Sequence, residues 1–211
     1  MAIRKIAQLG EPVLRVPARP LRVDEIGSAT IRSLISDMTE TMRDADGAGL
    51  AAPQVYEPLQ LCVIELVNNP RYPDLEPIPL SVLINPIVTP LTRGSPAEFP
   101  DEEAIWVYEG CLSVPGLRGR VRRPRKVRVR ALDAGGQALD FVWEGFRAAV
   151  VQHEVDHLNA TLFVDRALPG TLTFLREYER HVPREARVVD GLATLPAARR
   201  GAPPAGRDGS A

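Results

Sequence analysis

The sequence has few cysteines, no long apolar run and almost no net charge. Cys62 and Cys111 are its two cysteines among 211 residues, too few for a disulfide framework and in keeping with a reducing compartment. The opening residues, MAIRKIAQLGEPVLR, lack the apolar stretch of a signal peptide, and no segment approaches the roughly 18 apolar residues of a membrane span. A formal net charge of −1 gives no global attraction to nucleic acid or to an anionic membrane. We therefore expect a soluble, cytoplasmic protein that binds neither DNA nor a membrane.

The length and the end of the chain suggest one domain followed by a tail. A chain of 211 residues can bury a full core, and we expect a single domain over residues 1–182. Beyond it the sequence thins to LATLPAARRGAPPAGRDGSA, with too little apolar surface to offset the entropy of ordering. We expect residues 183–211 to be disordered.

Apolar spacing predicts one helix and then a series of strands. Ser28 is a candidate N-cap, and the apolar positions that follow it recur at helical spacing, so we expect a helix that ends near Arg43, before Gly47. Short β-branched or alternating segments separated by Pro, Gly or Asn predict strands at 59–66, 81–88, 104–110, 125–132 and 138–145. The proline-rich segment 68–79 is expected to be a surface loop.

The stretch HEVDH (153–157) places two histidines on one face of a second predicted helix. Helical periodicity begins near Gly145, and the apolar residues before His153 share its face, so both imidazoles should point toward the core. This arrangement lets both rings reach one metal ion, with Glu154 beside them as a proton carrier. After Pro169 and Gly170, renewed helical spacing predicts a last amphipathic helix over 172–182.

The third metal ligand is open to several candidates. A metzincin-type site would need glycine and histidine where the chain has Ala160 and Phe163. A thermolysin-type protease would use Glu177, at the expected distance after His157. A structural zinc site would need four ligands, which Cys62 or His181 would have to complete. Cys111 is the remaining candidate, and two imidazoles with one thiolate leave a position open for water.

The glycine-rich stretch GAGLAAPQ (47–54) favours Cys111, because a thermolysin-type protease has no use for it. Together with EGCLS (109–113) and HEVDH, in that order, it resembles the three signature motifs of the peptide deformylases, and the resemblance covers roughly residues 3–180. It implies an α+β fold, with antiparallel strands packed around a central metal-binding helix, a first helix before the glycine-rich motif and a last C-terminal helix. It also implies removal of the formyl group from N-formyl-methionine on nascent chains, with release of formate.

The resemblance also assigns roles to individual residues. It implies that Cys111, His153 and His157 hold the metal, which is Fe²⁺ with Zn²⁺, Ni²⁺ or Co²⁺ as substitutes. Glu154 matches the general acid/base. Gln54 and the backbone N–H of Leu112 match the donors that stabilise the oxyanion, an interaction worth a few kcal/mol. The implied partners are formyl-Met nascent peptides and, transiently, the ribosome.

We expect the substrate to lie as an added strand against small residues, with its methionine in an apolar pocket. The residues expected along the peptide are Ala48, Gly49 and Gly110, and those expected around the methionine are Phe146, Ala149 and Val150. For the pocket residues, plain core packing is an equally good interpretation.

The run LRGRVRRPRKVRVR (117–130) holds eight basic residues and no acidic one. Because most of them alternate with apolar or small residues, the favoured interpretation is a strand with a solvated charged face. The alternative is a patch that meets ribosomal RNA or carboxylates of the nascent chain. We expect Arg118 to reach the peptide groove and Arg123 to pair with Glu109.

Overall fold

The computed structural model describes residues 2–67, 69, 75–94 and 99–190. Half of the proline-rich loop expected at 68–79, namely residues 68 and 70–74, therefore lies outside the described residues, as does 191–211 of the expected tail. The strand that follows this loop begins earlier than predicted, since β3 spans Ile78–Pro90 rather than 81–88.

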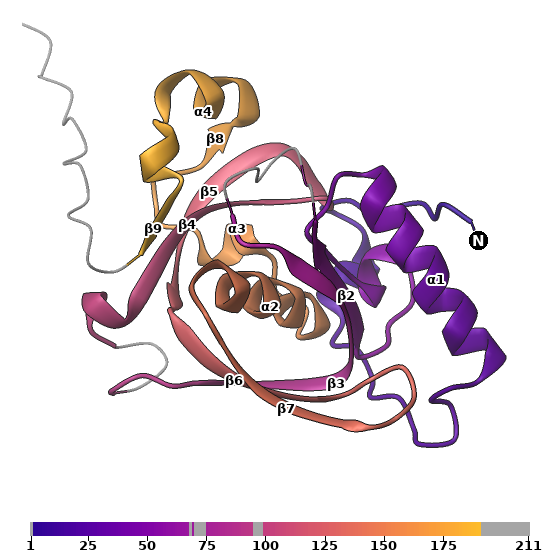
Figure 1. Ribbon diagram of the computed structural model, residues 1–211. Coiled ribbons are helices and arrows are strands. Elements are labelled where there is room, and N and C mark those ends of the chain that lie inside the picture. Colours follow the sequence, from indigo (N-terminus) through magenta and orange to yellow (C-terminus); the bar gives the residue numbers. More distant parts are fainter. Residues whose placement is uncertain (1, 68, 70–74, 95–98, 191–211) are drawn as a thin grey trace, which may run out of the picture.

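The larger sheet is fully antiparallel, with the strand order β1-β2-β3-β6-β7 (Figure 1). Its members are β1 (Gly49–Ala51), β2 (Leu61–Leu66), β3, β6 (Lys126–Leu132) and β7 (Ala138–Glu144). Strand β3 pairs with β2 through its first half and with β6 through its second half, with a register irregularity between Ile84 and Ile87. Ile84 pairs with Leu61 of β2 and with Leu132 of β6, so the two pairings meet at this residue.

The smaller sheet has the order β8-β5-β4-β9. It contains β4 (Ala104–Cys111), β5 (Val114–Pro124), β8 (Thr173–Phe174) and β9 (Val188–Asp190). The basic run 117–130 is thus divided between β5 and β6, which lie in different sheets, so it is not one strand.

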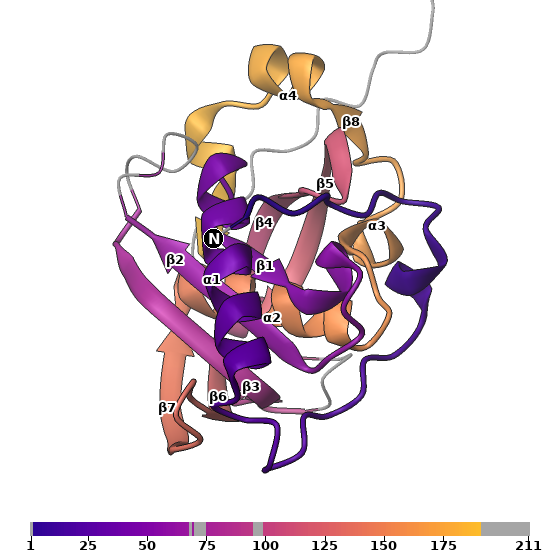
Figure 2. The same ribbon diagram turned by 90° about the vertical axis from the view of Figure 1, so that its right-hand side faces the viewer.

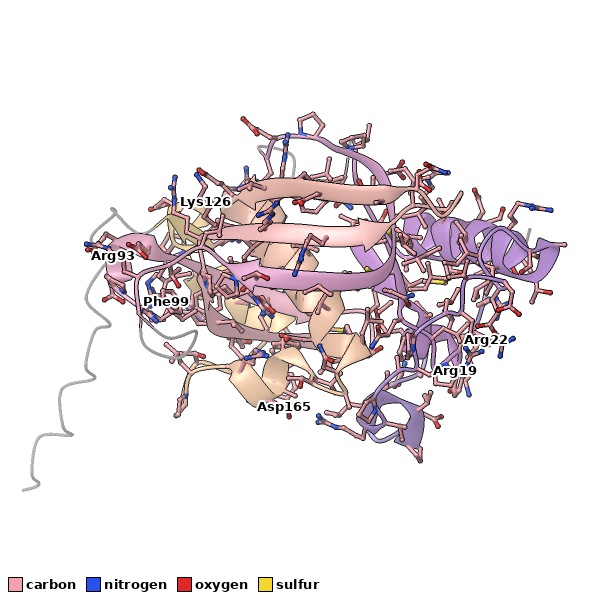
Figure 3. All side chains as sticks on the ribbon, turned by 90° about the horizontal axis from the view of Figure 1, so that it is seen from below. Arg19, Arg22, Arg93, Phe99, Lys126 and Asp165 are labelled. Carbon is pink, nitrogen blue, oxygen red and sulfur yellow. The ribbon has the colours of Figure 1, made fainter. Side chains whose placement is uncertain are left out.

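The outer faces of β6 and β7 carry paired charges rather than an open basic patch. Lys126 pairs with Glu144, and Arg128 donates to both oxygens of Asp140 at 2.7 and 2.6 Å. Figure 3 shows these strands from below, with Lys126 projecting near one end. Exposed pairs of this kind contribute little to stability.

Helix α1 (Ala29–Asp44) confirms the first predicted helix. The Ser28 hydroxyl accepts a hydrogen bond from the Ile31 amide at 3.3 Å, the capping interaction that the sequence predicted. Its apolar face includes Leu34, Met38 and Met42, all buried against β1 and β2 (Figure 2). Burial of each such side chain contributes roughly 1.5–3 kcal/mol, which fixes the helix in front of the glycine-rich segment.

Helix α2 (Gly145–Leu158) lies between the two sheets and contacts strands of both (Figure 1). Ala148, Ala149, Val150 and Val151 are all buried, so the helix is apolar around most of its circumference where it crosses the interior. The α+β fold of antiparallel strands is confirmed. The strands hold the HEVDH segment inside the molecule.

The C-terminal region differs from the prediction. The last helix begins later than expected, with α4 spanning Leu175–His181 after the short α3 (Phe163–Arg166) and β8. The expectation of disorder from residue 183 is wrong for residues 184–190, which form a 3-10 turn at Arg184–Ala186 and then β9, paired antiparallel with β4. Within the described part of the chain, no helix has the length and apolarity needed to cross a bilayer.

Candidate active site

Cys111, His153 and His157 come together at the end of β4. One ligand atom from each residue lies within 4.8 Å of the other two, and the Cys111 Sγ to His157 Nε2 distance is 3.1 Å. The four-residue spacing on α2 places both imidazoles on one side of the helix. Cys111, the last residue of β4, places its thiol beside them. Cys111 and His157 are buried, and His153 is nearly so.

Glu109 orients His153. Its carboxylate lies 2.8 Å from His153 Nδ1 and also accepts a hydrogen bond of 2.9 Å from Arg123, which is 3% exposed. The expected Arg123–Glu109 pair is therefore confirmed. A proton on Nδ1 that is donated to Glu109 leaves the Nε2 lone pair free for a metal.

The contact between Glu109 and His153 was not predicted. The sequence did carry a signal for it, because residues two apart on a strand share a face, and this places Glu109 on the same side of β4 as Cys111.

The surroundings of Cys111 favour the thiolate. Burial alone would raise the pKa of the thiol, but the charge of His157 and hydrogen bonds with His153 and His157 lower that pKa well below its ordinary value. The thiolate is the form that binds metals. By contrast, burial raises the pKa of the Cys62 thiol, which lies in β2 as an inert apolar residue.

Glu154 lies against the backbone of the glycine-rich segment. A side chain at Gly49 would collide with the Glu154 carboxylate, so glycine at this position makes room for it. The carboxylate is 4% exposed, and its Oε2 has no hydrogen-bond partner among the described residues. Burial raises the pKa of Glu154 to about 7, against the opposing charges of His153 and His157. A carboxyl group with that pKa both accepts and donates a proton near neutrality.

Gln54 reaches the cluster from the 3-10 turn Ala52–Val55. Its Oε1 accepts a hydrogen bond from the Ala51 amide at 2.8 Å, which aims Nε2 at Ser113 Oγ (3.1 Å) and Cys111 Sγ (3.5 Å). The side chain is 2% exposed and thus fixed in place. Ser113 is a partner that the sequence did not single out.

A cavity opens beside the cluster. The predicted substrate residues Ala48, Gly49, Gly110, Phe146, Ala149 and Val150 all line it, together with Val107, Leu112, His153 and Glu154. Arg118 is not among the lining residues, but its guanidinium occupies the space that a side chain at Gly110 would need. The structure thus brings the predicted groove and the predicted ligands to one place.

The alternative ligands lie elsewhere. Glu177 is on α4, and its carboxylate pairs with Arg180 and His181 at 3.4 and 3.3 Å. Across the described residues, the three-ligand cluster contains Cys111 and the two HEVDH histidines, without Glu177, Cys62 or His181. The thermolysin-type and four-ligand interpretations therefore lose their geometric basis.

Comparison with known proteins decides between the remaining classes. The polypeptide deformylase family model matches residues 3–171. The chain is 45% identical over 161 residues to peptide deformylase 1 of Nitrosomonas europaea, covering 76% of this chain and 85% of that protein. It is 44% identical over 191 residues to the peptide deformylase of Leptospira biflexa serovar Patoc, covering 90% of this chain and 100% of the relative.

The chain belongs to the polypeptide deformylase family. It is therefore an enzyme that removes the N-formyl group from nascent peptides. Solved deformylases also share the fold. A class I type b peptide deformylase from Acinetobacter baumannii with bound Met-Ala-Ser has a TM-score of 0.71 at 37% identity, covering 78% of this chain and 98% of that chain. A peptide deformylase from Synechococcus elongatus in complex with actinonin has a TM-score of 0.66 at 38% identity, covering 81% of each chain.

The residues of this deformylase family member fit a metal ion. The cluster offers one thiol with a lowered pKa and two imidazoles, a donor set that suits a borderline metal and leaves a further position open. Glu109 fixes His153 from behind, as outer carboxylates do at metal sites. The unpartnered Oε2 of Glu154 lies beside the donors, where a water molecule can supply its missing hydrogen bond.

Proposed function

We propose that deformylation takes place at the Cys111/His153/His157 cluster, with Fe²⁺ as the resident metal and Zn²⁺, Ni²⁺ or Co²⁺ as substitutes. The observation that carries this proposal is the clustering of three metal donors, two of them buried, beside the cavity that His153 and the buried Glu154 line. A metal ion held there supplies Lewis acidity, which makes water nucleophilic near neutral pH. The formamide, a poor electrophile, requires that activation.

Glu154 moves the proton. Its position between the two histidines keeps it beside the donors without joining them, and its raised pKa matches a group that takes a proton from water and returns it to the departing amine. Gly49 holds the carboxylate close to the backbone that would carry the substrate. The proton therefore travels a short path within the buried site.

Gln54 and the backbone N–H of Leu112 stabilise the oxygen of the formyl group as its carbon becomes tetrahedral. Support comes from the fixed amide of Gln54, whose Nε2 already points toward Cys111, and from Leu112, which follows Cys111 and lines the cavity. Fixed donors at that point act where charge develops, and they need no reorganisation during the reaction.

The peptide binds as an added strand between Gly110 of β4 and Ala48–Gly49 at β1. The formylated methionine then enters the pocket formed by Phe146, Ala149 and Val150. Arg118, whose guanidinium lies over Gly110, contacts the peptide beyond its first residue. The A. baumannii relative with bound Met-Ala-Ser supports a peptide of this kind as the ligand.

The substrate also suggests a place of action. Formylated N-termini exist on chains as they leave the ribosome, so we place the enzyme in the cytoplasm with transient ribosome contact. The two cysteines are both free thiols, which suits a reducing compartment.

Formate release from formyl-Met-Ala-Ser by anaerobically purified protein tests this proposal. We expect turnover that a chelator abolishes and that added Fe²⁺ or Ni²⁺ restores. A protein that carries the metal but releases no formate from this peptide would contradict it.

A further inference from the structure

Strand β9 occupies the edge of β4 immediately beside the proposed peptide groove. Val188 is opposite Val107, and the Tyr108 amide donates a hydrogen bond of 2.9 Å to the Arg187 carbonyl. Gly110 lies two residues beyond Tyr108 on β4, where the β4–β5 register is irregular, and it lines the active-site cavity. The part of β4 that β9 covers is therefore next along the strand to the part that lines the proposed peptide groove.

Val188 also packs behind the pocket itself. Its side chain joins a buried cluster made by Ile105, Val107 and Ala149, with Phe146 at its margin. Val107, Ala149 and Phe146 line the active-site cavity. Val188 is partly buried, and because the cluster that it packs against is close-packed, a change of volume at Val188 alters the packing behind the cavity wall.

The segment that carries Val188 is anchored by aromatic contacts. Tyr178 on α4 packs on Tyr108 with ring centroids 5.5 Å apart, and the Arg187 guanidinium lies 4.8 Å from the Tyr178 ring centroid. Figure 1 shows β9 beside β4, on the side of the molecule that carries α4. Residues 182–190, which we name the C-terminal strap, follow the end of the family match at residue 171.

We propose that the C-terminal strap is part of the active site and that Val188 is a specificity-determining residue, which sets the width of the pocket for the first side chain of the substrate. The proposal rests on the function proposed above. Val188 acts through the cluster of Ile105, Val107 and Ala149 and is not among the residues that line the cavity. A smaller residue at 188 lets these side chains retreat, whereas a larger one presses them into the cavity.

The test compares two substrates, formyl-Phe-Ala-Ser and formyl-Met-Ala-Ser. The kcat/KM for formyl-Phe-Ala-Ser divided by that for formyl-Met-Ala-Ser is measured for the wild-type protein, Val188→Ala and Val188→Leu. A methylene group in a pocket is worth at least about tenfold in discrimination, and because Val188 acts indirectly we expect about a fivefold rise in the ratio for Val188→Ala. Val188→Leu should lower it by a similar factor. The ratio is insensitive to the fraction of folded protein, so partial unfolding cannot imitate the result.

Val142→Ala is the matched control. Val142 is 46% exposed on β7, and its substitution should leave the ratio unchanged. Val189→Pro, which removes a backbone donor opposite Trp106 and loosens β9, should raise the ratio as Val188→Ala does. An unchanged ratio in all strap variants, or an equal loss of activity on both substrates, would overturn the inference. Absence of formate release by the wild-type protein would instead reject the proposed function.

Discussion

The carboxylate of Glu109 lies 2.8 Å from Nδ1 of His153. This contact ties a residue of β4 to a residue of α2, so the strand that supplies one ligand also orients another. The Arg123 guanidinium bonds both Glu109 and Asp156 and fixes the carboxylate in turn.

Glu109→Gln should weaken metal binding while leaving the three donors in place. Loss of an outer carboxylate typically costs about 10- to 100-fold in metal affinity, because the imidazole loses both its orientation and part of its basicity. Competition with a chelator measures the change. Glu144→Gln, a change on the exposed face of β7, is the control, and equal affinities in the two variants would argue against a role for Glu109.

Glu154→Gln should retain the metal and lose deformylation by about 10²- to 10⁴-fold, since the amide neither accepts nor returns the proton. Metal analysis and formate release are measured on the same preparation. Near-normal turnover by this variant would remove Glu154 from the reaction.

Gln54→Ala should lower kcat about 10²-fold with unchanged metal content, the usual effect of removing one oxyanion donor. Steady-state kinetics distinguishes a loss of kcat from a change of KM. A change confined to KM would mean that Gln54 positions the substrate in its ground state only.

Cys111→Ala and Glu177→Ala form a discriminating pair. Cys111→Ala should lose metal and activity together, because it removes a donor of the cluster. Glu177 pairs with Arg180 and His181 on α4, so its replacement should leave both properties largely intact. Metal retained at full activity by Cys111→Ala would overturn the ligand assignment.

Arg123→Ala should destabilise the fold. The guanidinium is buried between Glu109 and Asp156, and removing one partner from a buried ion pair costs about 3–5 kcal/mol. Arg128→Ala breaks an exposed pair with Asp140 and should cost roughly 1 kcal/mol or less. Denaturant unfolding of the two variants compares these values, and equal losses would contradict the buried network.

Local chemistry explains what the sequence predicted well. Ser28 caps α1 by accepting a hydrogen bond from the amide of Ile31, three residues later in the chain. The HEVDH spacing fixes two imidazoles on one helical face. Neither feature depends on distant partners. The position of Cys111 beside them was one of several alternatives, favoured by the glycine-rich stretch and by the resemblance to the deformylase motifs, because no local pattern brings β4 to α2. Core packing between the sheets and the helix makes that contact.

Non-local pairing explains what was missed. Strand β9 holds only three residues and gains its order from β4, about eighty positions earlier in the chain, so its short β-branched pair gave no usable period. The basic run was misread as one strand for a related reason. Basic residues fall at every second position both before and after the interruption at 123–125, and the separate partners of β5 and β6 divide the run between two sheets.

The pairing of β9 with β4 also bears on self-association of the protein. An uncovered strand edge is a template on which any other extended chain can align. Strand β9 covers Ile105, Trp106 and Val107, and in the described part of the chain Gly110 has no strand beside it on that edge. The stretch left uncovered is short, and short edges are one of the ways in which folded proteins limit edge-to-edge pairing with a second copy.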